Sequence, residues 1–214
     1  PWASPDEKGF GILPHYTLGC AKLRGVQIDP ETGKRFVNEM GDRKECADAI
    51  LEVGHPVISI VDSRGIAAFE EMKDQALEKG VLWEFETIDT LIDHFDIDEE
   101  GFKQELERWN GFVEQGVDED FGKAIVEGTE PIAEPPFYAC RTWPKVHHTM
   151  GGVQTNMDTR VLDLEGSPIA GLYAAGEVVG GIHGACRLGS VATSECLTHG
   201  RIAGQNAAAE QAWA

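Results

Sequence analysis

The sequence has 214 residues, 42% of them hydrophobic, which is enough to bury the core of one large domain or of two small ones. Its formal net charge of -19 argues against binding to nucleic acid or to an anionic membrane, because phosphate contacts need clustered Lys and Arg. It contains no apolar run of about 18 residues, so no membrane span is expected.

The cysteines and the first residue give little information about the cell compartment. The five cysteines include no CxxC pair and no His-spaced cluster, so we expect free thiols rather than a disulfide framework or a metal site. The chain begins with Pro1, and no charged segment followed by an apolar one precedes the fold, so we expect a fragment or a processed product. A soluble protein of the cytoplasm or of the periplasm fits this sequence.

The first 115 residues predict short strands alternating with helices. Residues 1–20 are rich in Gly and Pro and are typical of a loop. Residues 25–29 and 35–39 alternate like strands on either side of a turn, so a hairpin is expected. Apolar spacing predicts helices over 42–53, 66–79, 87–95 and 98–115, and short apolar runs predict strands over 56–62 and 81–86.

The composition changes after residues 116–136, an acidic stretch that we expect to be a loop. Residues 137–143 are strand-like and lead into a Gly-rich region, so we place a domain boundary near residue 146. Two further strands are predicted over 160–164 and 171–175, and a helix rich in small residues is predicted over 190–214.

Three Gly-rich loops within about 40 residues, at 147–153, 171–178 and 180–189, carry the strongest chemical signal in the sequence. Glycines let a backbone approach a ligand closely, and the predicted helix start at Ser190 offers unpaired N–H groups to an anion or to an electron-rich ring edge. One such loop would favour a simple tight turn, but three of them favour a binding site. Its candidate side chains are His147, Glu177, His183 and Arg187.

These loops resemble a known family. The order HHTMGGV, GLYAAGEVVGGIHGACRLG, HGRIAG is similar to the C-terminal signature of the fumarate reductase and succinate dehydrogenase flavoproteins, especially the soluble flavocytochrome-type enzymes and relatives that reduce other unsaturated acids such as urocanate. The segments GKRFVNE and PFYA also match. The resemblance implies an α+β capping domain over 16–146. It also implies two pieces of an α/β Rossmann-like FAD-binding domain: the end of a first segment over 1–15 and a C-terminal strand and helix segment over 147–214.

The resemblance also implies the chemistry. FAD would pass a hydride to one alkene carbon, and Arg43 would protonate the neighbouring carbon. His147 and Arg187 match the pair that binds the substrate carboxylate, and His15 matches a residue that holds the other end of a dicarboxylate. The expected FAD contacts are Gly176, Glu177, Gly180, Gly181, His183, Gly189, Ser190 and Val191. His148 is expected to be structural, and His199 to have a surface or core role.

The sequence departs from the family pattern at several points. The stretch between His15 and Gly33 is shorter, and the proton relay of the fumarate reductases has no clean counterpart. Cys186 replaces a usual Asn, and Ser190 with Val191 replaces a Gly-Asn pair. A monocarboxylic enoate therefore fits as well as fumarate. The dinucleotide fingerprint GxGxxG is absent, so the rest of the FAD site is expected from an N-terminal part or a partner chain, and a separate electron-donor protein is possible.

The leading hypothesis is thus an FAD-dependent reductase of an α,β-unsaturated carboxylate. Two alternatives stay open. One is a dehydrogenase or oxidase of the same superfamily that works in the oxidative direction, and the other is a non-catalytic capping or binding module without flavin. The HHTMGG segment and Arg187 favour a carboxylate over a steroid, and the flavin-side loop and the last helix argue against a pure cap.

Overall fold

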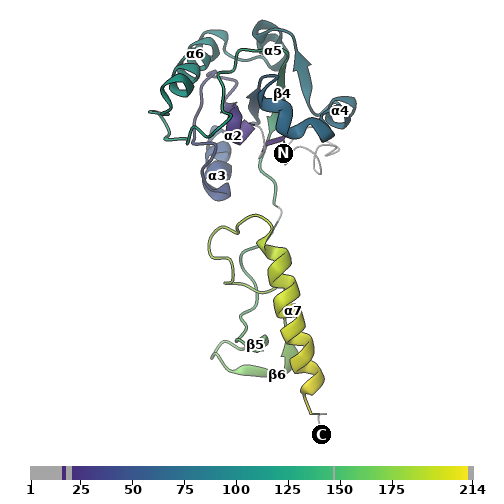
Figure 1. Ribbon diagram of the computed structural model, residues 1–214. Coiled ribbons are helices and arrows are strands. Elements are labelled where there is room, and N and C mark those ends of the chain that lie inside the picture. Colours follow the sequence, from purple (N-terminus) through teal and green to yellow (C-terminus); the bar gives the residue numbers. More distant parts are fainter. Residues whose placement is uncertain (1–15, 18–20, 147, 212–214) are drawn as a thin grey trace. The chain divides into compact units, whose positions relative to one another are not determined.

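The computed structural model describes residues 16–17, 21–146 and 148–211 (Figure 1). The expectations for residues 1–15, including His15, and for His147 lie outside these residues. The chain divides into two compact units, residues 1–145 and 146–214, which we call unit 1 and unit 2 and describe separately. Their interpretation as a capping domain and a segment of the FAD-binding domain stays a prediction.

Unit 1 is built on a four-stranded antiparallel sheet. Its strands are β1 (Val26–Ile28), β2 (Val57–Val61), β3 (Trp83–Phe85) and β4 (Phe137–Thr142), in the order β1-β2-β4-β3. All five residues of β2 are buried, because this strand pairs on both edges and is covered on both faces. The continuous apolar run that predicted a buried strand therefore occupies a central position in the sheet.

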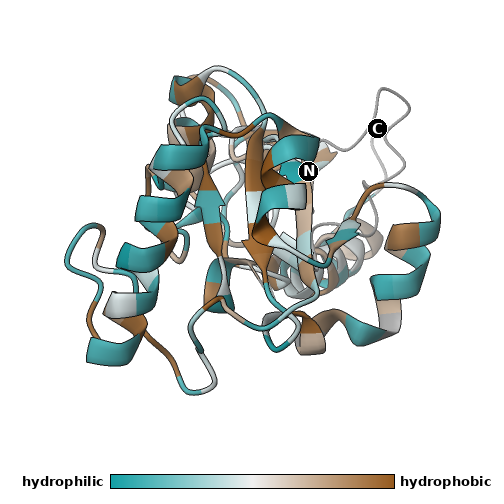
Figure 2. Cartoon of the chain, turned by 90° about the horizontal axis from the view of Figure 1, so that it is seen from above, coloured by the Kyte–Doolittle hydropathy of each residue, from teal (hydrophilic) through white to brown (hydrophobic). Residues whose placement is uncertain are grey.

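The two faces of this sheet bury separate hydrophobic clusters, as the alternation of side chains along a strand requires. Ile58 and Ile60 point into a cluster with Trp109, while Val61 points into another with Tyr16. Figure 2 shows the hydrophobic residues gathered on the strands, with hydrophilic residues on the outer faces of the helices. The helical elements of unit 1 are α2 (Lys22–Arg24), α3 (Arg43–Val53), the 3-10 helix η2 (Gly65–Phe69), α4 (Glu70–Glu78), α5 (Ile88–Phe95) and α6 (Glu99–Gln115).

Capping residues set the ends of these helices. Asp42 accepts hydrogen bonds from the first turn of α3 and completes a capping box with Glu45, and Asp98 accepts the Gly101 N–H at the start of α6. Thr87 caps α5 by accepting the Thr90 N–H. These helices therefore begin where the sequence signals place them, whereas the helix expected over 66–79 opens as the 3-10 helix η2.

The predicted hairpin over 25–29 and 35–39 is wrong in its second strand. Arg35 forms a single antiparallel bridge with Ile28, and residues 36–39 are not a strand. The physical reason is that Glu39 turns its side chain inward, where its Oε1 accepts the Gln27 N–H at 3.0 Å. A side chain thus satisfies the β1 edge that a second strand was expected to pair.

Unit 2 contains a two-stranded antiparallel sheet, β5 (Arg160–Leu162) and β6 (Pro168–Tyr173), followed by the long helix α7 (Val191–Ala209). The strands are offset from the predicted ranges, and α7 is shorter than expected. Eleven of the thirteen exposed large hydrophobic side chains among the described residues lie in unit 2, whereas both hydrophobic clusters lie in unit 1.

The mixed α and β character expected from the sequence is confirmed, and both named sheets are antiparallel. In the part of the chain that the structure describes, no helix is both long and apolar enough to cross a membrane.

Candidate functional site

The turn that follows β6 is held by a carboxylate on α7. The N–H of Gly176 donates to Oε1 of Glu195 at 3.0 Å, and Nδ1 of His199 lies 3.1 Å from the same oxygen. The Glu195 side chain is buried, and Gly176 has a φ of 83°, which a residue with a side chain rarely adopts. The first turns of α7 therefore fix the backbone from which Glu177 projects.

Glu177 links two of the Gly-rich loops. Its Oε1 accepts the Thr149 N–H at 2.8 Å, and its Oε2 lies 3.5 Å from Nδ1 of His148. The His148 ring in turn packs edge-on against His183, with ring centroids 5.4 Å apart. Of the predicted site residues, Glu177 and His183 are thus brought into one cluster, and His148 lies between them. Half of the Glu177 side chain stays exposed to solvent.

The same two loops meet at glycines. The Val153 N–H donates to the Val178 carbonyl at 2.9 Å, and the Gly180 N–H donates to the Val153 carbonyl at 3.0 Å. A Cβ at Gly152 would lie 2.1 Å from the Val178 oxygen, and one at Gly180 would lie 2.5 Å from the Gly152 nitrogen. Both positions therefore need glycine so that the loops can approach backbone to backbone.

Arg187 is buried, yet its guanidinium is only partly satisfied. One terminal nitrogen, Nη1, donates to the Leu188 carbonyl at 2.9 Å, while the buried Nε has no hydrogen-bond partner among the described residues. A buried donor without a partner costs free energy, so such a group is a candidate for pairing with an anionic ligand. Among the described residues, no hydrogen bond or ion pair joins another predicted site side chain to this guanidinium.

The start of α7 leaves donors free in a similar way. Ser190, the N-cap, has a φ of 64° and its side chain makes no capping hydrogen bond. The Thr193 N–H donates to the Ser190 carbonyl at 3.2 Å. The N–H groups ahead of it, those of Val191 and Ala192, have no intrahelical acceptor and are candidates to bind a ligand. Gly189, Ser190 and Val191 are all exposed here.

These residues fit FAD. A Cβ at Gly181 or at Gly184 would meet no atom within 4 Å, so the loop between them has an open surface. Ile182 and Leu188 are exposed beside these glycines and offer apolar contacts to a flat ring, while α7 and Arg187 offer donors to polar edges. In the described part of the chain, no group of His, Cys, Asp or Glu is suited to hold a metal ion.

Arg43 lies in unit 1, at the first residue of α3, and its side chain is exposed. Among the described residues, no hydrogen bond or ion pair holds its guanidinium. His15 and His147, which were predicted to bind the substrate together with Arg187, lie outside the described residues.

The sequence reasoning missed Glu195 and His199 as a pair that supports the site. Their signal was present, because residues four apart on a helix share a face, and a carboxylate next to an imidazole at that spacing can hold it by a hydrogen bond. The missing element was the partner of Glu195, the backbone N–H of Gly176, which no side-chain pattern reveals.

Comparisons with known proteins identify the family of the chain. The family model described as FAD binding domain matches residues 6–193. The acrylate reductase flavoprotein subunit of Shewanella woodyi is 43% identical, over 95% of this chain and 41% of the relative. The open conformation of a flavocytochrome c3 fumarate reductase is a solved structure with a TM-score of 0.65 and 33% identity, over 87% of this chain and 32% of that one.

A second solved structure, 3-ketosteroid delta1-dehydrogenase from Sterolibacterium denitrificans, has a TM-score of 0.71 and 26% identity, over 90% of this chain and 40% of that one. The chain thus spans less than half the length of each of these three relatives. The family model nevertheless covers most of the chain, and the relatives include a fumarate reductase and an acrylate reductase. The chain therefore belongs to the FAD-binding domain family of the fumarate reductase-type flavoproteins, and its cofactor is FAD.

Proposed function

We propose that this chain is part of a reductase of an α,β-unsaturated carboxylate. Unit 1 is then the substrate-capping domain, and unit 2 is the C-terminal segment of a Rossmann-like FAD-binding domain. The observation that carries the proposal is the buried Arg187, whose Nε has no partner among the described residues and which sits in a Gly-rich loop beside an uncapped helix start. Such a guanidinium suits a carboxylate, which can accept two parallel hydrogen bonds from it.

When bound, FAD supplies the hydride for such a reduction. In the proposal, Arg187 and His147 bind the substrate carboxylate and so fix which alkene carbon faces the hydride donor. Arg187 also stabilises the negative charge that develops on the carboxylate side of the alkene as the hydride adds, because a fixed cation in a water-poor site stabilises the transition state more than the substrate.

Arg43 is proposed as the proton donor to the second alkene carbon. The addition of one hydride and one proton converts the alkene to the saturated acid and leaves a neutral guanidine that must regain a proton. A free arginine has a pKa above about 12 and is a weak acid, so transfer requires that the carbanion-like product be much more basic. Arg43 is exposed in this structure, so solvent is the source of the proton that restores its guanidinium. Asp42 and Glu45, one and two residues away in the sequence, are candidates to take up a proton from solvent and pass it on.

The substrate class is proposed as a small enoate, with a monocarboxylate favoured over fumarate. The acrylate reductase subunit is the more similar of the two named reductases compared, and the sequence has no clean counterpart of the fumarate reductase relay. The second candidate is dehydrogenation in the oxidative direction, which the likeness to a 3-ketosteroid dehydrogenase supports. A neutral steroid would leave the buried Arg187 without an anionic partner, so we place this candidate second.

The test is stopped-flow reoxidation of the dithionite-reduced, FAD-loaded flavoprotein in which this chain is assembled with the rest of the FAD-binding domain. Acrylate, fumarate, urocanate, cinnamate and a 3-keto-4-ene steroid are compared as oxidants. We expect fast reoxidation by one of the acids and none by the steroid. The proposal fails if no acid reoxidises the flavin, and the second candidate gains support if the oxidised protein is instead reduced by a saturated 3-ketosteroid. The same panel shows whether one carboxylate or two are required.

A further inference from the structure

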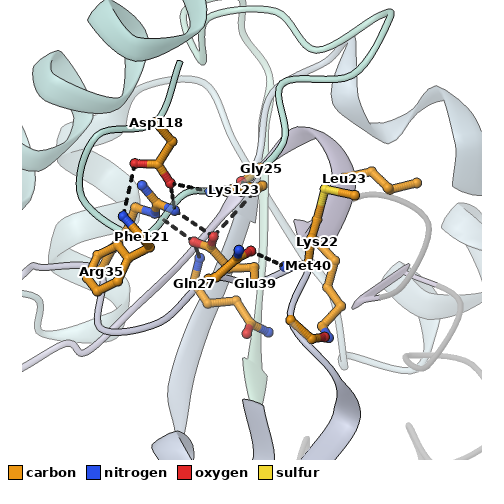
Figure 3. A network of polar contacts seen from close by, with 12 residues as sticks. Lys22, Leu23, Gly25, Gln27, Arg35, Glu39, Met40, Asp118, Phe121 and Lys123 are labelled. Atoms are coloured by element: carbon orange, nitrogen blue, oxygen red, sulfur yellow. Dashed lines mark hydrogen bonds and ion pairs between the residues drawn. The ribbon is translucent and has the colours of Figure 1, made fainter. Parts of the chain in front are cut away.

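Four charged side chains are buried together inside unit 1 (Figure 3). Arg35 donates to both oxygens of the Glu39 carboxylate at 2.8 Å, and its Nη2 also donates to Asp118 at 2.9 Å. Lys123 Nζ lies 3.5 Å from Glu39 Oε2 and donates to the Gly25 carbonyl at 2.5 Å. All four charged side chains are fully excluded from solvent, and two cations balance two carboxylates.

Stability alone does not explain this cluster. Burial, the largest effect on Lys123, lowers its pKa to about 8, which shows that the protonated amine is held at a cost despite the neighbouring Glu39 carboxylate. Apolar side chains of similar volume often stabilise a core as well as buried ion pairs do, or better. What the cluster provides is geometry, since Arg35 fixes both oxygens of Glu39 and thereby fixes where residue 39 lies.

From Glu39 onward, hydrogen bonds hold each step of the backbone. The Glu39 carboxylate also accepts the Gln27 N–H at 3.0 Å, which ties it to β1. The Met40 N–H donates to Oδ1 of Asn38, and the Gly41 N–H donates to the Asn38 carbonyl, each at 2.9 Å. The loop between the buried cluster and α3 is therefore a closed turn rather than a free connection.

A second anchor holds the other side of this turn. Lys22 Nζ donates to the Gly41 carbonyl at 3.3 Å and to the Cys46 sulfur at 3.1 Å. The buried Cys46 sulfur lies 3.6 Å from each of three carbonyl oxygens, those of Asn38, Glu39 and Gly41, so its S–H has an acceptor in the turn whichever way it points. Lys22 and Cys46 thus connect α2, the turn and α3.

The turn that these hydrogen bonds hold leads directly to Arg43. It follows the N-cap Asp42 directly, and the capping box of Asp42 and Glu45 sets the direction in which α3 starts. The Arg43 side chain is exposed and is held by no described partner. The position of its backbone at the start of α3 therefore determines which region the guanidinium can reach. A cation at a helix start also opposes the helix dipole, so helix stability does not favour Arg at this position.

We propose that Lys22 and Cys46 are positioning residues that, together with the buried Glu39, hold the backbone of Arg43 in place for proton transfer. This inference rests on the proposed function, in which Arg43 is the proton donor. A displacement of about 1 Å in a reacting group costs on the order of 10²-fold in rate, so a loosened turn is expected to reduce turnover while substrate binding through Arg187 is retained.

The test compares three variants of the same assembled, FAD-loaded flavoprotein. Lys22→Met removes both hydrogen bonds of the amine, Lys22→Arg keeps a donor, and Lys34→Met is the matched control because Lys34 is exposed on the same unit and loses the same charge. Cys46→Ala serves as a second probe if Lys22→Met does not fold. The measurements are reoxidation of the reduced flavin by the preferred acid, reoxidation by ferricyanide, which needs no proton from Arg43, and hydrogen exchange of the amides of residues 40–46.

For Lys22→Met we expect reoxidation by the acid to slow by about 10-fold or more, with KM within about 2-fold of the parent. Ferricyanide reoxidation should be unchanged, and exchange over residues 40–46 should be faster. Lys22→Arg should recover much of the rate, and Lys34→Met should behave as the parent.

Two results would overturn the inference and leave the proposed function intact. The first is unchanged exchange over residues 40–46 in the folded Lys22→Met or Cys46→Ala variant. The second is faster exchange with an unchanged acid rate, while Arg43→Ala abolishes that rate. If Arg43→Ala itself reacts as fast as the parent, the role of Arg43 in the proposed function is wrong, and the positioning role falls with it.

Discussion

Replacing Lys123 with Met is expected to change how the stability of unit 1 depends on pH. In the folded chain the pKa of Lys123 is about 8, lowered mainly by burial from its usual 10.5. Below pH 8 the amine is protonated in both states. Above it the folded state releases its proton first, so the unfolded state binds more protons up to about pH 10.5. The free energy of unfolding of the parent therefore rises with pH across this window.

The magnitude follows from the two pKa values. Their difference corresponds to about 3 kcal/mol over the whole window, of which about 2 kcal/mol falls between pH 7.5 and 9.5. Burial raises the pKa of Cys140 to about 12 and also raises that of Tyr138, and both effects lower the stability as the pH rises. These groups are common to the parent and the variant, so the difference between the two proteins isolates Lys123.

The assay is urea unfolding followed by tryptophan fluorescence at pH 7.5 and 9.5, with Lys34→Met as the control. Trp109 is fully buried beside the Lys123 amine and reports on this core. The unfolding free energy of the parent minus that of Lys123→Met should grow by about 2 kcal/mol between the two pH values. A difference that stays constant would refute the reasoning, because it would mean that Lys123 does not change its protonation on unfolding in this range.

Three further predictions concern the proposed site. Arg187→Lys keeps the charge but loses the bidentate geometry, so the activation free energy derived from kcat/KM for the preferred acid should rise by about 2–4 kcal/mol. An unchanged kcat/KM would mean that Arg187 does not bind the carboxylate. Arg43→Ala should retain FAD and its reduction by dithionite but nearly lose acid reduction, and stopped-flow rates equal to the parent would make Arg43 a structural residue. Gly180→Ala places a Cβ 2.5 Å from the Gly152 nitrogen, so it should lower the free energy of unfolding by about 1–3 kcal/mol and reduce the FAD content, measured as absorbance at the flavin bands. Gly200→Ala is the control, because its Cβ would meet no atom within 4 Å and the flavin absorbance should stay unchanged.

The secondary structure of unit 1 was predictable where local chemistry decides it. Asp42, Thr87 and Asp98 accept hydrogen bonds from the first turns of their helices, so these helix starts could be read from single residues. The second strand of the hairpin was not predictable, because its failure depends on Glu39. The Arg35 guanidinium donates both to that carboxylate and to Asp118, which lies far along the chain, and no local pattern encodes the contact with Asp118.

The candidate site was predictable in its loops but not in its supports. The glycines and Arg187 stand out because their residue types are unusual in their setting, and the family resemblance gave them roles. The support from Glu195 is made to a backbone N–H, so the sequence shows only one of its two partners. The buried cluster in unit 1 was invisible for a related reason, since Lys123 looks like any surface lysine until its surroundings are known.

The two units use polar burial for different purposes, and this contrast bears on how the protein works. Unit 1 packs its buried charges against its hydrophobic core, where Arg35 and Lys123 both lie over the Trp109 ring, and in our proposal they help to fix the exposed Arg43. Unit 2 buries Glu195 and Arg187, while eleven large hydrophobic side chains among its described residues stay exposed. The loops that carry the proposed ligand-binding groups therefore lie outside the two hydrophobic clusters, both of which are in unit 1. A loop site of that kind needs a further apolar surface against those side chains before Arg187 and the start of α7 can bind a cofactor and an acid with defined geometry. In the proposed function that surface belongs to the rest of the FAD-binding domain, and the substrate site then forms only when the whole flavoprotein is assembled.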